Sequence, residues 1–160
     1  MIKHIKCDIF ESGADVICHQ VNCQGVMGSG IAKQVREKYP KVYEEYKKVC
    51  DKYKDRPHAL LGLMLPVGTV VEYNTQFRGI SNLFAQEYYG YDGKCYTDYD
   101  ALRQCLEEVN RCTPNGCTVA IPYLMGCYRG GGDWNIVYKM IEEAFADFDG
   151  EVLICEYCGG

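Results

Sequence analysis

Long apolar runs and clustered basic residues are both absent from the sequence. No apolar stretch within its 160 residues approaches the length of a membrane span, and its start does not have the pattern of a secretory signal peptide. The largest basic cluster is the pair Lys47-Lys48, and the formal net charge is −5. Because sequence-independent nucleic-acid binding requires many cations that neutralise phosphates, the composition argues against it. These absences predict a cytoplasmic protein without a membrane-bound segment.

A pattern of residues with the spacing of a metal site is absent as well. The three histidines, His4, His19 and His58, do not have the spacing of a metal site. One Cys-x-x-Cys pair, Cys155 and Cys158, is present, but a zinc site would need a second pair of ligands. The eleven cysteines form an odd number and lie mostly in apolar segments, which disfavours a secreted disulfide framework. We therefore expect reduced, core-filling cysteines and neither a metal nor another cofactor.

The most informative segment is a glycine-rich loop between a strand and a helix. The apolar run 15–21 is typical of a strand, three glycines follow within residues 25–30, and helical spacing begins near Ser29. Glycines let a ligand approach the main chain closely, and a helix N-terminus presents unpaired N–H groups at the positive end of its dipole. Strand, glycine loop and helix N-terminus together form a common phosphate-binding arrangement. The segment therefore predicts binding of a phosphorylated small molecule.

Strands and helices alternate along the chain. Strands are expected at residues 2–7, 15–22, 60–66, 69–73, 79–85, 117–122 and 151–157, and helices at 29–39, 40–53, 97–111 and 133–148. The form Thr97-Asp98-Tyr99-Asp100 resembles a capping box for the third helix, and Pro40 suits the first position of the second. This alternation predicts a single α/β domain over residues 1–160, a three-layer α/β/α sandwich with a mixed, largely parallel sheet. Ligands bind such sheets beyond the carboxyl ends of the strands.

A second segment repeats the arrangement of the first glycine loop. The expected strand at 117–122 is followed by residues 123–133, where four glycines fall within the seven positions 126–132, and then by a helix. Ordering each glycine costs conformational entropy, so four of them are unfavourable in a simple connector. Two such loops at the same end of one sheet could hold a diphosphate from both sides.

These segments together resemble the macrodomain, the ADP-ribose-binding module. The resemblance runs from Ile2 to Tyr157 and is carried by four pieces: Cys7-Asp8-Ile9, residues 22–32, Asn82-Leu83-Phe84 and residues 121–134. The form N-C-Q-G-x-M-G-x-G-I-A, followed by Y-P, is similar to the compact branch of the family. That branch contains terminal ADP-ribose glycohydrolases, bacterial DNA de-ADP-ribosylases and fungal ADP-ribose-1''-phosphate phosphatases.

The resemblance implies which residues contact the ligand. Asp8 would accept a hydrogen bond from the adenine amino group, with the Ile9 backbone beside it, or would bond its own turn instead. Tyr157 would flank the adenine or pack into the core. The diphosphate and distal ribose would be contacted by backbone N–H groups of Gly28, Ser29, Gly30 and Ile31, and covered on the other side by Gly126, Cys127, Tyr128, Arg129 and Gly130.

Three residues are candidates for catalysis. Asn22 stands where the family has an asparagine near the distal ribose, and its amide would bond either ribose hydroxyls or its own loop. His19 stands at a position implicated in the phosphatases, and an imidazole titrates near neutral pH, which suits general acid–base catalysis. Its alternative role is that of a hydrogen-bonded core histidine. Asp133 is placed to cap the helix that follows, or to orient a water beside the distal ribose.

The sequence also departs from the glycohydrolase pattern at two positions. Those relatives use a lysine where this chain has Gln86, and an aspartate where it has Gly130. A lysine can form a covalent adduct with an opened ribose, whereas a glutamine cannot. The departures therefore disfavour the lysine-dependent mechanism.

Three functions follow from the resemblance. The favoured one is hydrolysis of ADP-ribose-1''-phosphate or a related ADP-ribosyl ester by water, assisted by His19 or Asp133. The second is a non-catalytic module that reads ADP-ribosylated macromolecules or sequesters NAD-derived nucleotides. The third, a lysine-independent DNA or protein de-ADP-ribosylase, is disfavoured by Gln86 and Gly130. In each case we expect a monomer whose partner is ADP-ribose or its derivative, and nucleic acid only if it is ADP-ribosylated.

Overall fold

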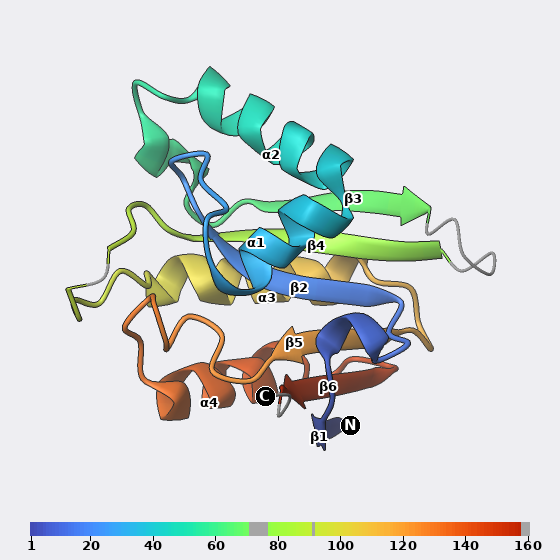
Figure 1. Cartoon of the computed structure of the whole chain (residues 1–160). Coiled ribbons are helices and arrows are strands. Elements are labelled where there is room, and N and C mark those ends of the chain that lie inside the picture. Colours follow the sequence, from blue (N-terminus) through green and yellow to red (C-terminus); the bar gives the residue numbers. More distant parts are fainter. Residues whose placement is uncertain (71–76, 91, 158–160) are drawn as a thin grey trace.

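A six-stranded sheet forms the middle of the molecule in the computed structural model, which describes residues 1–70, 77–90 and 92–157 (Figure 1). Its strands are β1 (Ile2–Lys6), β2 (Val16–Asn22), β3 (Met64–Val70), β4 (Phe77–Gln86), β5 (Thr118–Pro122) and β6 (Glu151–Glu156). The spatial order is β1-β6-β5-β2-β4-β3, and every neighbouring pair is parallel except β3 and β4. The predicted mixed, largely parallel sheet is confirmed.

Helices cover both faces of this sheet. On one face lie α1 (Gly30–Lys38), α2 (Pro40–Lys52) and the short 3₁₀ helix η1 (Ile9–Glu11), which share a core with inward residues of β2 and β4. On the other face, α3 (Tyr99–Cys112) and α4 (Trp134–Ala144) pack on a second core. The central strands are apolar on both faces, as expected for a sheet between two helical layers. The predicted α/β/α sandwich is therefore confirmed. No helix among the described residues is both long and apolar enough to cross a membrane.

Helix starts follow the expected capping chemistry with one exception. Pro40 occupies the first turn of α2, as predicted. Asp133 caps α4, because its carboxylate accepts a hydrogen bond from the Asn135 N–H at 2.8 Å. The capping box predicted from Thr97 is wrong: Asp98 caps α3 through the Ala101 N–H, at 2.9 Å. Thr97 cannot be the cap because its hydroxyl donates to a distant carbonyl instead.

Three predicted boundaries also differ from the structure. The expected strand at 60–66 begins later, because residues 57–60 form the 3₁₀ helix η2 (Pro57–Leu60). From Met64 the strand continues without a break to Val70, so the expected run 69–73 is partly its continuation, and residues 71–73 lie outside the described residues. Helix α4 ends at Ala144 instead of residue 148. Phe145 and Phe148 then pack edge-to-face against each other, with ring centroids 5.4 Å apart.

Candidate functional site

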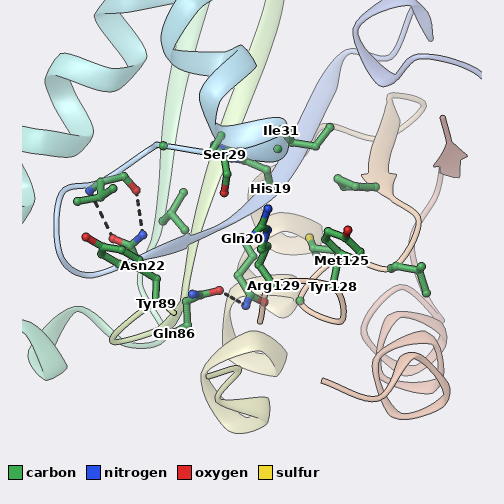
Figure 2. Close-up of a pocket in the computed structure, with 18 of the residues that line it drawn as sticks. His19, Gln20, Asn22, Ser29, Ile31, Gln86, Tyr89, Met125, Tyr128 and Arg129 are labelled. Atoms are coloured by element: carbon green, nitrogen blue, oxygen red, sulfur yellow. Dashed lines mark hydrogen bonds between the residues drawn. The ribbon is translucent and has the colours of Figure 1, made fainter. Parts of the chain in front are cut away.

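A cleft of about 260 Å³ lies at the carboxyl ends of β2, β4 and β5 (Figure 2). One side, which we call the first wall, is formed by residues 22–32, the first glycine loop and the start of α1. The opposite side, the second wall, is formed by residues 122–132, the second glycine loop. The lining residues are His19, Gln20, Val21, Asn22, Val26, Gly28, Ser29, Gly30, Ile31, Ala32, Gln86, Tyr89, Gly90, Pro122, Tyr123, Leu124, Met125, Gly126, Tyr128 and Arg129. The topology thus brings both predicted glycine loops to one cleft.

The N-terminus of α1 opens into this cleft. Ser29 is its N-cap residue, but the serine side chain makes no capping hydrogen bond and the first turn contains no acidic residue. In contrast, the carboxylates of Asp98 and Asp133 cap α3 and α4. Among the described residues that line the cleft there is no carboxylate and no lysine, and Arg129 is the one strong cation. Although the whole chain is acidic, the cleft therefore favours an anionic ligand at the helix N-terminus.

Asn22 braces the first wall. Its Oδ1 accepts hydrogen bonds from the Gln24 N–H at 2.9 Å and the Val26 N–H at 3.4 Å, and its Nδ2 donates to the Val26 carbonyl at 2.9 Å. The buried Tyr46 hydroxyl, from α2, lies 2.8 Å from both Asn22 oxygens. The structure thus shows the loop-bracing role of Asn22, while the side chain still borders the cleft (Figure 2).

The glycines of the second wall are required by packing more than by access to the cleft. A Cβ atom at Gly130 would lie 2.5 Å from Thr97 Oγ1 and 2.6 Å from the Gly126 carbonyl oxygen, and one at Gly132 would lie 2.8 Å from the same carbonyl. A Cβ at Gly131 would likewise clash with the Lys94 carbonyl oxygen. Gly126 is the one glycine of residues 126–132 that lines the cleft, and a Cβ there would also lie only 2.7 Å from Gln20 Oε1. The aspartate of the glycohydrolase pattern would not fit at Gly130 without movement of the loop.

Leu124 has a strained backbone within the second wall. Its φ of 63° lies in the left-handed region, and it is the one such non-glycine among the described residues. The Met125 N–H donates to the Pro122 carbonyl at 3.0 Å, which closes a turn that ordinarily has glycine at the position of Leu124. A leucine there costs about 1–2 kcal/mol. Such strain is common at functional sites, and Leu124 lines the cleft.

His19 is a neutral, buried side chain at the floor of the cleft. Its Nε2 donates to Oδ1 of Asn82 on the neighbouring strand β4 at 2.5 Å, and no described residue donates to its Nδ1. Burial lowers the pKa of His19 from 6.5 to about 4, although the Asn82 hydrogen bond acts in the opposite direction. The expectation that this imidazole titrates near neutral pH is therefore wrong. At pH 7 the imidazole can accept a proton or a hydrogen bond at Nδ1, but its protonated form, which would act as an acid, is hardly populated.

The lowered pKa of His19 predicts an acid-sensitive fold. The unfolded chain binds more protons between the ordinary value of 6.5 and about 4, so the free energy of unfolding should fall as pH decreases through this range. Over the whole range, the free energy of unfolding should fall by about 3 kcal/mol. Denaturant unfolding of wild type and His19→Gln, measured from pH 7 to pH 4.5, should show the shallower decline in the variant. Equal slopes would contradict the burial of an uncharged imidazole.

Six predicted site residues do not line the cleft. The carboxylate of Asp8 caps η1 by accepting from the Phe10 N–H at 2.9 Å, and Ile9 is buried in the core. Asp133 is exposed and serves as the α4 cap. Cys127 turns its thiol to the Met125 carbonyl, and Tyr157, after β6, is 65% exposed. Gly130, discussed above, is also absent from the lining.

Other lining residues were missed by sequence reasoning. Tyr89 and Gly90 come from the segment after β4, which has neither a motif nor a regular pattern. Tyr123 lies half-buried between His4 and Trp134, with ring centroids 4.9 and 5.3 Å away. Its position directly after a buried strand was the available signal, because ligands bind beyond such strand ends.

The described residues contain no group of three or more histidine, cysteine or acidic side chains that could hold a metal ion. The cysteines within residues 1–157 are all free thiols. Burial raises the pKa of Cys23, Cys105 and Cys155 to about 12, so these thiols are not reactive nucleophiles. Cys158, the second member of the Cys-x-x-Cys pair, lies outside the described residues.

Fold and cleft together define the class of this protein. The chain belongs to the Macro domain family, whose sequence model matches residues 18–141. The structure also superimposes on the macrodomain of Mycobacterium tuberculosis DarG with a TM-score of 0.77 and 26% identity, covering 97% of each chain.

Several curated relatives carry named activities. The chain is 32% identical over 130 residues to an ADP-ribose 1''-phosphate phosphatase of Scheffersomyces stipitis, covering 71% of this chain and 74% of that protein. It is 30% identical over 168 aligned residues to a DNA ADP-ribosyl glycohydrolase of Mycobacterium tuberculosis. That alignment covers all of this chain but only 43% of the mycobacterial protein.

Proposed function

We propose that the cleft binds ADP-ribose, with the diphosphate on the backbone N–H groups at the start of α1. The observation that carries this proposal is an uncapped helix N-terminus that opens into a cleft without carboxylates. Gly28, Ser29, Gly30 and Ile31 line the cleft at this point, as expected for the residues that contact the diphosphate and distal ribose. The relatives named for ADP-ribose derivatives support the same ligand class.

We place the adenine beside the cleft, at the carboxyl ends of β1 and β6. Asp8 follows β1 and Tyr157 follows β6, and these strands are paired in parallel with Lys6 opposite Glu156. The two residues therefore emerge together at the carboxyl edge of the sheet. One carboxylate oxygen of Asp8 accepts from the Phe10 N–H, which leaves the other for an adenine amino group.

We further propose that the protein hydrolyses ADP-ribose-1''-phosphate or a related ADP-ribosyl ester. For the phosphate ester, the oxygen of water bonds to phosphorus, the bond from phosphorus to the ribose oxygen breaks, and a water proton passes to that leaving oxygen. His19, neutral and with an unprotonated Nδ1, is the lining residue that could accept the proton first. The named phosphatase relative supports this chemistry. Release of inorganic phosphate from saturating ADP-ribose-1''-phosphate tests it.

A non-catalytic module that reads or sequesters ADP-ribose is the second candidate. It is favoured by the chemistry of the described lining residues, which include no carboxylate and no lysine, and by Asp133 acting as a helix cap outside the cleft. Gln86 argues against the lysine-dependent glycohydrolase route, because a side-chain amide cannot form the covalent adduct that a lysine amine forms. The Gln86 amide instead hydrogen-bonds Gln20 and the Tyr88 carbonyl. Tight binding of ADP-ribose without phosphate release would select the non-catalytic function.

A further inference from the structure

We propose that Thr97 is a positioning residue that holds the second wall of the cleft in its ligand-binding position. Thr97 does not line the cleft. It precedes α3, is 7% exposed and lies between the sheet and the second wall. The inference rests on the proposed function, because the position of this wall matters only if the cleft holds a ligand.

A relay of side-chain hydrogen bonds passes through the Thr97 hydroxyl. Nε2 of Gln20, on β2, donates to Oε1 of Gln86 at 2.8 Å (Figure 2). The same Nε2 donates to Oγ1 of Thr97 at 2.9 Å. The Thr97 hydroxyl in turn donates to the Gly126 carbonyl at 2.6 Å. Its single hydrogen is thus directed at the second wall while its oxygen accepts from the sheet. The relay connects two strand ends to a loop that follows a third strand.

The backbone around Thr97 fixes a second point of the same loop. The N–H groups of Tyr96 and Thr97 both donate to the Gly130 carbonyl, at 2.6 and 3.0 Å. The Gly132 N–H closes the loop by donating to the Gly126 carbonyl at 2.8 Å. Residues 127–129 therefore lie between two carbonyls, those of Gly126 and Gly130, that both accept hydrogen bonds from residues 96–97. Tyr128 and Arg129, which line the cleft, project from this span.

Steric fit explains why a single hydroxyl can control this wall. Gly126, Gly130 and Gly132 leave no space for a Cβ next to Thr97 or the Gly126 carbonyl, so the loop sits directly on the threonine. Without the hydroxyl, the Gly126 carbonyl keeps the Gly132 N–H as its partner and Gln20 keeps Gln86. The fold should survive, while the loop loses its side-chain link to the sheet.

The matched pair Thr97→Ser and Thr97→Ala tests this inference, because the two variants differ by one oxygen atom. Calorimetric titration of the full chain with ADP-ribose should give an affinity for Thr97→Ser within about threefold of wild type and for Thr97→Ala about tenfold weaker or more. Hydrogen exchange should accelerate in Thr97→Ala at the Gly132 amide, but not at the amides of β2. A purely structural role would lower global stability in Thr97→Ala without this local change.

The outcomes separate the inference from the proposed function. If wild type does not bind ADP-ribose, the proposed function fails, and faster exchange at Gly132 in Thr97→Ala alone still supports the positioning role. If Thr97→Ala does not fold, Gln20→Met, which removes the donor to Thr97, should show the same local acceleration at Gly132. Equal affinity and equal Gly132 exchange in Thr97→Ser and Thr97→Ala overturn the inference.

Discussion

Gly28→Glu is expected to weaken ADP-ribose binding by about a hundredfold or more. Gly28 does not have a positive φ, and a Cβ at this position would meet only Val26 Cγ1, at an ordinary 3.5 Å. The glutamate side chain should therefore enter the cleft without backbone strain. Its carboxylate would repel the diphosphate and itself occupy the N-terminus of α1. Calorimetric titration measures the loss.

Gly28→Gln is the matched control, because it has nearly the same size without the charge. It should lose less affinity than the glutamate variant. Gly30→Glu is less informative, because Gly30 has a φ of 58° and any side chain there strains the backbone as well as introducing charge. Unchanged affinity in Gly28→Glu would contradict the proposal that the N-terminus of α1 binds the diphosphate.

His19→Ala is expected to lower kcat for ADP-ribose-1''-phosphate by about a hundredfold, the usual contribution of a positioned acid–base group. Binding of ADP-ribose should survive, since backbone N–H groups hold the diphosphate. His19→Gln is a gentler variant, because an amide can still donate to Asn82 while it lacks a basic nitrogen. Phosphate release at saturating substrate measures the effect. Asp133→Ala should cost about 1 kcal/mol of stability and leave the rate nearly unchanged, as expected for a helix cap.

The pH profile provides an independent check of the same residue. The neutral imidazole is the active form, and burial lowers the pKa of His19 to about 4, so protonation of His19 should reduce kcat only as pH falls toward 4. If His19→Ala is as active as wild type, the assignment of the chemistry to His19 is wrong. If wild type releases no phosphate, the non-catalytic function replaces the enzyme.

Local patterns predicted the fold and the first wall of the cleft. The glycines of residues 25–30 after an apolar strand indicated a turn into a helix, and α1 begins at Gly30. Asp133, between a glycine run and apolar helical spacing, indicated the cap that the structure shows. These predictions succeed because the interactions involved join residues close together in sequence.

Two of the incorrect expectations concern contacts between distant segments. The pKa of His19 depends on burial of the imidazole in the folded protein and on its hydrogen bond to Asn82, which is 63 positions away in the sequence. Thr97 is a residue type that often caps helices, but its hydroxyl instead donates to the carbonyl of Gly126, which is 29 positions away in the sequence. Sequence spacing contains no information on either contact, because both depend on which strands become neighbours in the sheet.

The most direct test of the account compares ADP-ribose with AMP by calorimetric titration of the wild-type protein. The uncapped start of α1 and the second wall are proposed to hold the diphosphate and the distal ribose, and AMP lacks the second phosphate and that ribose. ADP-ribose should therefore bind about tenfold or more tightly than AMP. Equal affinities, or binding of AMP without binding of ADP-ribose, would contradict the claim that this cleft is built around the diphosphate.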